Sequence, residues 1–497
     1  MKKNVNFRKF FSSKKFKYGS AAVVLTAVFC AFVILINALF TVISNKNGGF
    51  YIDLTEEKIY DLSAKSLEVI SELDQSVEII FCTTEDRIDD SSALSYVKRL
   101  AEKYSSLTEN VSVVFRDSVK DPGYFNQFKK TSADIISQTS VIINCPENKR
   151  YIVYSDRNFF KFAAETGAMF AYDGESKLTS AIVQTALNQT LKAAFIIGHG
   201  EEKRSTLETL LKEQGYDVSE VDLKKISAPE LAQYNLLLIC NPKYDYTGIA
   251  DENEGRVNEI GMLNRYLSEN FGNLMVFISP DTPNLKEFSG FLADDWGVGY
   301  SSGTIVAESS RMAVDSSGLY FIGTPSYNGA EGESIHSPVT QTGADITIFA
   351  NATPLSITFE TNGTKTVSPV YTTSKESVCY IDGEIKPMPS LPLMTISTNT
   401  KIKDSKEYTS RVLVCGSGVY LNALSDQSFS NADVLKNTFA KMGNENVVTG
   451  IKYKVLEDTA LTTTLDEFKA HTIKLTLIVP LIIAIVGIVI YIKRKKA

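Results

Sequence analysis

The stretch AAFIIGHGEE, residues 193–202, decides the fold of the larger part of this chain. Its first five residues are uninterruptedly apolar, which is typical of a strand buried on both faces of a parallel sheet. Gly198 and Gly200 predict a tight turn after this strand. A helix is expected over residues 201–214, with Gly215 ending it. The stretch therefore predicts a strand, a turn and a helix in succession, which is the repeating unit of an α/β domain.

The same alternation continues towards the C-terminus. Strands are expected at 216–223, 234–240, 274–279 and 411–415, and helices at 254–270, 284–296 and 431–442. Strands that alternate with helices predict a doubly wound parallel sheet. The stretch 300–399 is rich in Ser, Thr and Gly, so we expect β-strands and long loops there, as a β-rich insertion in a domain over 176–443.

A second α/β domain is expected over residues 44–175. Ser63 is a suitable N-cap for a helix that starts at residue 64, and residues 92–106 have helical periodicity. Strands are expected at 77–82, 111–115, 141–144 and 151–154. A membrane-proximal connector over 444–472 follows the larger domain.

Two apolar segments lie near the ends of the chain. Residues 20–43 contain no charged side chain, and neither do residues 475–492, which predicts transmembrane helices over 20–43 and 473–492. The tails 1–19 and 493–497 are basic, which places both in the cytoplasm and the large domain outside it. We expect a two-pass protein of the plasma membrane. The alternative, a cleaved signal peptide, is disfavoured by the length of the first segment and by the lack of a cleavage site.

Composition excludes several functions. Without the eleven basic residues of the two tails, 40 basic side chains face 58 acidic ones, which disfavours binding to nucleic acid. No Gly-x-x-x-x-Gly-Lys-Ser/Thr sequence occurs, so no nucleotide site of that kind is predicted. The six cysteines lack metal or redox spacing, and those outside residues 20–43 are expected to be buried free thiols. No cofactor and no metal site is predicted.

The candidate site is the turn formed by Gly198, His199, Gly200 and Glu201. Open α/β sheets bind ligands beyond the carboxyl ends of their strands, helix-start amides bind anions, and a histidine can act as a base or a metal ligand. The structural alternative is that the glycines make a tight turn while the acids at 201 and 202 complement the helix dipole. No nucleophile or metal partner for His199 is evident, so no catalytic residue is predicted. In the sequence 415–418 no glycine precedes the cysteine as a nucleophile elbow requires, which indicates a structural turn.

Several motifs in this order resemble a known family. They are DLTEEKIYDLS at 53–63, the turn at 198–201, Trp296-Gly297, SDQSFSN at 425–431 and Gly443-Asn444. The pattern, over nearly the whole chain, resembles the GldG family of auxiliary components of ABC-type transport systems, first associated with gliding motility.

This resemblance implies a membrane-anchored, non-catalytic subunit that works beside a separate ABC permease and ATPase. It also implies that the outer domain is similar to class I glutamine amidotransferases without their catalytic cysteine, with Asn241-Pro242 where the cysteine elbow would lie. The extracytoplasmic domain would bind a substrate or a partner. Two alternatives stay open: a cell-surface hydrolase or ligand-binding protein with a site near His199, helped by Glu201, Glu202 or Asp281, and an adhesion protein that uses the stretch 300–399.

Overall fold

The computed structural model describes residues 59–456, apart from gaps at 90–91, 130–133, 163–166, 188–190, 310, 341–345, 404, 427, 444–447 and 449. It also describes a few isolated residues nearer to each terminus. The predicted membrane segments at 20–43 and 473–492 and both basic tails lie almost entirely outside the described residues. Within the part that is described, no helix has the length and apolar character needed to cross a bilayer.

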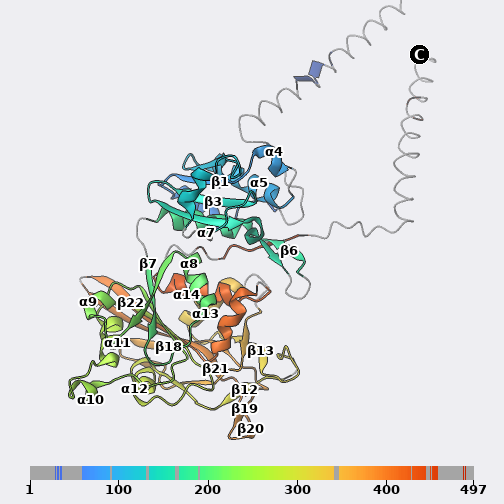
Figure 1. Cartoon of the computed structure of the whole chain (residues 1–497). Helices are drawn as coiled ribbons and strands as arrows, with labels where there is room; N and C mark the ends of the chain where they lie inside the picture. Colours follow the sequence, from blue (N-terminus) through green and yellow to red (C-terminus); the bar gives the residue numbers. More distant parts are fainter. Residues whose placement is uncertain are drawn as a thin grey trace, which may run out of the picture. The chain divides into compact units, whose positions relative to one another are not determined.

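The first domain contains a four-stranded sheet in the order β2-β1-β3-β4 (Figure 1). Strands β1 and β2 are parallel, while β3 is antiparallel to both of its neighbours. Ser63 caps α3 by accepting a hydrogen bond from the amide of Ser66, as its sequence position predicts. The elements are α3 (Ala64–Ser71), β1 (Val77–Phe81), α4 (Glu85–Asp89), α5 (Ser92–Leu107), β2 (Val111–Phe115), α6 (Pro122–Phe125), β3 (Ser140–Cys145), β4 (Arg150–Ser155), β5 (Phe160–Phe162), β6 (Met169–Tyr172) and α7 (Gly174–Ala186).

The second domain is built on five parallel strands, β7 (Leu191–Ile197), β8 (Tyr216–Asp222), β9 (Leu236–Cys240), β10 (Asn273–Phe277) and β22 (Lys406–Cys415). They lie in the order β8-β7-β9-β10-β22. This is the flavodoxin-like doubly wound order, in which the direction of winding reverses between the first and third strands. The predicted α/β class and parallel sheet are therefore confirmed, and the switch point lies between β7 and β9.

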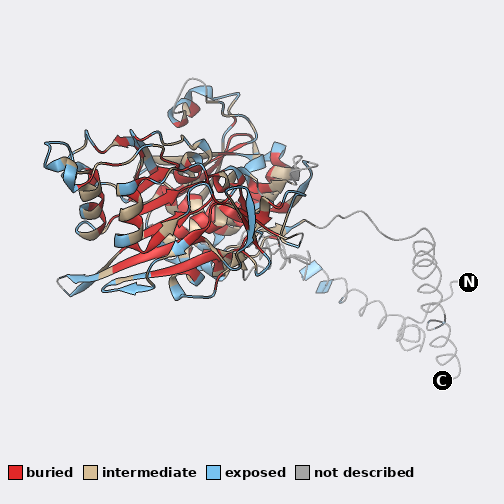
Figure 2. Ribbon diagram, turned by 90° about the horizontal axis from the view of Figure 1, so that it is seen from below, coloured by how far each residue is buried: buried red, intermediate tan, exposed pale blue. Residues whose placement is uncertain are grey.

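Side chains of each central strand alternate between two cores. Leu236 and Leu238 pack with the helices α8 (Ser205–Glu213) and α14 (Asn431–Lys441), whereas Leu237 and Ile239 pack with α11 (Glu259–Ser268). Figure 2 shows these buried strands running through the interior of the domain. The uninterrupted apolar runs seen in the sequence are thus explained by burial on both faces. The other described α-helices of this domain are α9 (Ala228–Leu231), α10 (Ile249–Glu252), α12 (Lys286–Gly290) and α13 (Ala330–Thr340).

The stretch 300–399 is rich in strands, as expected, but part of it belongs to the central sheet. Strand β21 (Pro392–Lys403) pairs antiparallel with β22, and β18 (Lys365–Thr372) pairs with β21. The helix α13 was not predicted, because Pro338 lies inside it and its apolar positions are few. Shorter strands make up the rest: β11 (Val298–Tyr300), β12 (Ile305–Ala307), β13 (Tyr320–Ile322), β14 (Thr324–Pro325), β15 (Ile348–Ala350), β16 (Leu355–Ile357), β17 (Thr361–Asn362), β19 (Val378–Ile381) and β20 (Glu384–Pro387).

The segment that follows α14 returns to the first domain. Its strand β23 (Lys454–Val455) pairs antiparallel with β6. The five described cysteines, which are Cys82, Cys145, Cys240, Cys379 and Cys415, are all free and buried, which confirms that prediction for them. Cys30 lies outside the described residues.

Candidate functional site

The candidate turn follows the carboxyl end of β7 and lies against the loop that follows β9, at the switch point of the sheet. Gly198 and Gly200 have φ angles of +117° and +74°, values that favour glycine. The carbonyl oxygen of His199 accepts hydrogen bonds from the amides of Lys243 and Tyr244, at 2.8 and 2.9 Å. A Cβ atom on Gly200 would approach the Cβ of Lys243 to 3.0 Å, so the second glycine also allows this close packing. The predicted tight turn is present and is fixed to the loop after β9.

The imidazole of His199 lies between two carboxylates. Its Nδ1 is 3.2 Å from Oε1 of Glu201, and its Nε2 is 3.1 Å from Oε2 of Glu259. All three side chains are buried, with exposed fractions of 1%, 4% and 0%. Both ring nitrogens are therefore occupied by acceptors from the protein itself.

Aromatic rings and hydroxyl groups enclose this triad. The ring of Tyr246 stacks on the imidazole at a centroid distance of 3.9 Å, and its hydroxyl donates to Oε1 of Glu201 at 2.8 Å. Phe288 stacks behind Tyr246 at 5.0 Å. The amide and the hydroxyl of Thr247 donate to Oε2 of Glu259 at 2.9 and 2.8 Å. Each carboxylate thus has donors besides the histidine.

The charges of the triad stabilise one another. Burial alone would lower the pKa of His199, but the hydrogen bonds and negative charges of Glu201 and Glu259 outweigh burial and raise that pKa to about 9. Burial acts to raise the pKa of each glutamate, yet hydrogen bonds from His199 and its neighbours hold both below the usual value. At neutral pH the ring is therefore an imidazolium, which has no lone pair to offer a metal ion or a proton.

One part of the structural interpretation is wrong. Helix α8 begins at Ser205, so Glu201 and Glu202 lie in the loop before it and do not form its first turn. Glu201 hydrogen-bonds the amide and ring of His199 instead. For the same reason the amides of Gly200 and Glu201 do not open the helix, and the expected anion site at a helix start is not formed there.

A second polar cluster lies on the same edge of the sheet, around Asn241. This residue is buried and has a φ angle of +51°, a left-handed conformation that asparagine adopts more readily than most residues. Its amide nitrogen donates to Glu202 and to Asp281, and its oxygen accepts from the hydroxyl of Thr282. Lys243 pairs with Asp281 at 2.5 Å. The structure therefore places Glu201 beside His199 but gathers Glu202 and Asp281 around Asn241.

Sequence reasoning missed Glu259 and Tyr246 as members of the site. Glu259 lies 60 positions after His199 and starts α11, in a stretch for which the sequence predicts only a helix. Only the adjacency of β7 and β9 brings it to the imidazole. No pattern in the chain signals that contact, although a buried histidine at a switch point needs polar partners.

A cavity of about 450 Å³ lies beside this edge, along β7 and β8. Its polar wall contains Glu201, Glu202, Lys203, Glu208 and Glu220. Lys203 pairs with Glu220 at 3.3 Å, and Glu208 pairs with Lys212 outside the cavity. Among the described residues, no group of three or more His, Cys, Asp or Glu side chains is placed to hold a metal ion.

Comparisons with known proteins assign no family to the chain. No family model matches the sequence, and no curated protein matches it. Among solved structures, the mmIFT52 N-terminal domain is 15% identical, with a TM-score of 0.36, over 50% of this chain and 96% of that one. A ThuA-like protein from Bacteroides uniformis is 13% identical, with a TM-score of 0.33, over 52% of this chain and 93% of that one.

Proposed function

We propose that this protein is a non-catalytic, membrane-anchored auxiliary subunit of an ABC transporter, as its resemblance to the GldG family implies. Its extracytoplasmic domain would bind a substrate or a partner beside a separate permease and ATPase. The observation that carries the non-catalytic part is the buried triad of His199, Glu201 and Glu259. It occupies the switch point, where doubly wound enzymes bind ligands, and its histidine has both nitrogens engaged.

The residue at the position where a catalytic nucleophile would lie supports the same proposal. We infer that the second domain is related to class I glutamine amidotransferases, in which a cysteine would follow a strand such as β9. Asn241 stands there. The preceding Cys240 is buried, and burial raises the pKa of its thiol to about 12, so the nucleophilic thiolate does not form at neutral pH.

Two observations support the membrane anchorage. Four described residues of the first apolar segment, Val28, Phe32, Ile34 and Leu35, are helical and have exposed fractions of 61–68%. In addition, the ammonium group of Lys454 donates to the carbonyl oxygens of Ile59 and Asp61. The chain at residues 59–61 is therefore in contact with the chain at residue 454, which is compatible with two spans that lie near one another.

Purification of the tagged full-length protein in a mild detergent, followed by mass spectrometry, tests the proposal. We expect a multi-span permease and an ATPase in stoichiometric amounts. An unrelated tagged membrane protein from the same cells is the matched control for nonspecific recovery. Recovery of the protein alone, under conditions that keep known membrane complexes intact, would contradict the accessory role.

Replacement of His199 separates this proposal from the hydrolase alternative. We expect His199→Gln to reduce stability and assembly together, because the residue holds two loops in place. Loss of a cell-surface function with assembly and folding intact would instead favour a catalytic or binding role for the histidine.

A further inference from the structure

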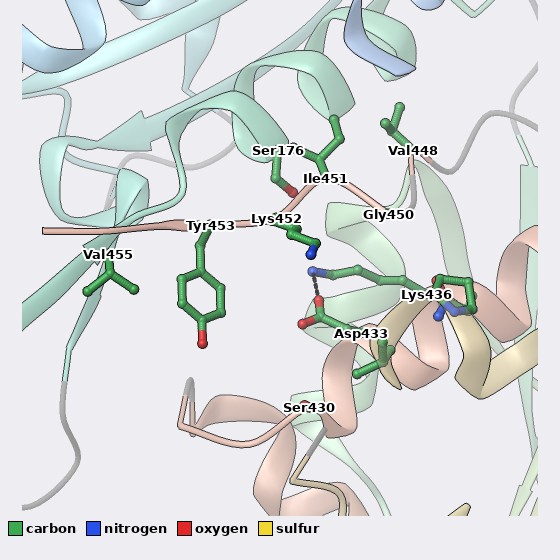
Figure 3. Close-up of a pocket in the computed structure, with 13 residues that line it drawn as sticks. Ser176, Ser430, Asp433, Lys436, Val448, Gly450, Ile451, Lys452, Tyr453 and Val455 are labelled. Atoms are coloured by element: carbon green, nitrogen blue, oxygen red, sulfur yellow. Dashed lines mark hydrogen bonds and ion pairs between the residues drawn. The ribbon is translucent and has the colours of Figure 1, made fainter. Parts of the chain in front are cut away.

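The molecule has cavities besides the closed space around His199. One, of about 390 Å³, lies beside α14, where Asp433 and Lys436 form an ion pair at 2.9 Å (Figure 3). Another is the cavity of about 450 Å³ along β7 and β8, whose volume is typical of ligand pockets, at about 300–1,000 Å³. This cavity borders the outermost strand of the central sheet, so a sheet edge belongs to its surroundings.

Strand β8 is the last strand of the central sheet. It pairs with β7 over residues 216–222, and among the described residues no strand pairs with its other side. Successive residues of a strand direct their backbone groups to opposite sides, so every second N–H and C=O of β8 points away from β7. Such an edge can pair with another extended chain through main-chain hydrogen bonds.

The cavity lies on one face of β8, next to this open edge. Its apolar floor contains Phe195, Ile197 and Val218, and Ile197 is 37% exposed. Phe195 and Val218 are partly buried and pack against the core that includes Leu207 of α8. An apolar side chain placed on this floor would remove it from water, which is favourable. The floor is therefore suited to an apolar side chain of a chain that pairs with β8.

The opposite face of β8 has an exposed carboxylate. Side chains of a strand alternate between its faces, so Asp217 lies on the face opposite to Val218 and the cavity. Glu220, at the cavity, pairs with Lys203, but these side chains are 49% and 74% exposed, and such a surface pair contributes little. A second copy of β8 would bring two sets of acidic side chains together, and like charges on neighbouring strands are destabilising. A basic side chain beside Asp217 is favoured instead.

We propose that the outer edge of β8 is a binding site for an extended peptide segment of a partner protein. The segment adds one strand to the central sheet, with an apolar side chain in the cavity and a basic side chain beside Asp217. Alternating apolar and basic residues are the pattern that these two faces recognise. The inference does not rest on the transporter role, because the edge and the cavity belong to this chain alone.

Titration calorimetry with a synthetic peptide tests the site, using the full-length protein in nanodiscs of neutral phosphatidylcholine. The probe is acetyl-Lys-Val-Lys-Val-Lys-Val-Lys-amide, which we name the lysine–valine peptide, and we expect it to bind saturably. The same peptide with glutamate in place of lysine should not bind, because it repels Asp217 and Glu220. Empty nanodiscs are the control for binding to the lipid and to the scaffold.

N-methylation of the probe distinguishes strand addition from simple attraction between charges. Residues whose side chains share one face of a strand direct their N–H groups to the same edge. Methyl groups on the valine amides therefore block one edge of the peptide, and methyl groups on the lysine amides block the other. We expect one methylated peptide to lose about tenfold or more in affinity and the other to bind about as well as the parent.

Variants of the protein locate the binding site. Ile197→Lys places a charge on the apolar floor, and Asp217→Lys repels the basic residues of the probe. Each should weaken binding of the lysine–valine peptide about threefold or more. Glu376→Lys makes the same change of charge as Asp217→Lys at an exposed position outside β8 and its cavity, and it should change nothing.

Three results would overturn the proposal. They are no saturable binding of the lysine–valine peptide, equal affinities of the two methylated peptides, and unchanged affinity in both Ile197→Lys and Asp217→Lys. Both replaced side chains are exposed, so neither change disturbs the core. Recovery of the protein alone in the detergent experiment would leave peptide binding unaffected, so the two proposals fail separately.

Discussion

The switch point around His199 and the cavity beside α14 both have charged side chains, but only the second has open volume next to them. At the switch point the imidazolium of His199 lies between two carboxylates, and Lys224 pairs with Glu259 at 3.7 Å, so two positive groups face two negative ones. Aromatic and hydroxyl groups close the space around them. Beside α14 the ion pair of Asp433 and Lys436, at 2.9 Å, borders an open volume of about 390 Å³. The comparison indicates that a charged cluster is structural when its charges are balanced within the protein.

Removal of the histidine should have the largest effect. His199→Ala leaves Glu201 and Glu259 as buried carboxylates without their shared partner, and we expect a loss of about 3–5 kcal/mol in the free energy of unfolding. Urea unfolding monitored by the fluorescence of Trp296 measures it, because the chain's single tryptophan is fully buried in the same domain. Lys286→Ala is the control. A loss below about 1 kcal/mol would show that the triad is not a structural unit.

The triad also predicts a dependence on pH. The pKa of His199 is about 9 in the folded protein against an ordinary value of 6.5, so its contribution to stability is complete below pH 6.5 and is lost as the pH rises through 9. We expect a decrease of about 3 kcal/mol, from about 1.4 kcal/mol per pH unit. Lys224, 3.4 Å from Nε2, also faces the ring, and Tyr246 stacks on it.

At acid pH the dependence of folding stability on pH has the opposite sign. The pKa values of Glu201 and Glu259 are lowered, so their contribution is present above their usual values and is lost as the pH falls through the folded ones. The same fluorescence measurement across the pH range should give a maximum between these limits. In His199→Gln the decrease on the alkaline side should disappear, and its persistence would assign it to another group.

Loss of the Lys454 contact should have a smaller effect, confined to the first domain. Lys454→Met leaves Glu175 buried and the carbonyl oxygens of Ile59 and Asp61 without this donor. We expect about 1–3 kcal/mol less protection of β6 and β23 in hydrogen exchange. Lys286→Met, at a side chain of the second domain that is 90% exposed, should leave the protection unchanged. Equal effects of both variants would show that β23 is not held by Lys454.

The smallest effect is expected from Tyr246→Phe. The ring and its stacking on His199 are retained, and only the hydroxyl hydrogen bond to Glu201 is lost. We expect a loss of about 0.5–1.5 kcal/mol, measured by the same urea unfolding. A loss as large as that of His199→Ala would mean that the stacked ring does not support the triad without its hydroxyl.

By itself the sequence determined the α/β class, the buried parallel strands and the turn at Gly198 and Gly200. Uninterrupted apolar runs and glycine positions are local signals. Burial on two faces is the physical reason for the apolar runs, and positive φ angles are the reason for the glycines. The start of α8 was misplaced because the acids at 201 and 202 suit a helix start as well as they suit a loop. Helix α13 was missed because Pro338 interrupts its pattern.

Only the tertiary structure decided what the charged residues do. The order β8-β7-β9 brings Glu259 to His199 across 60 positions, and β23 pairs with β6 although the two strands lie far apart in the sequence. The sequence around a carboxylate does not indicate a partner that lies far along the chain. The interaction energy of two charges depends on their distance and burial, which the fold alone determines. The same physics makes His199 a buried imidazolium.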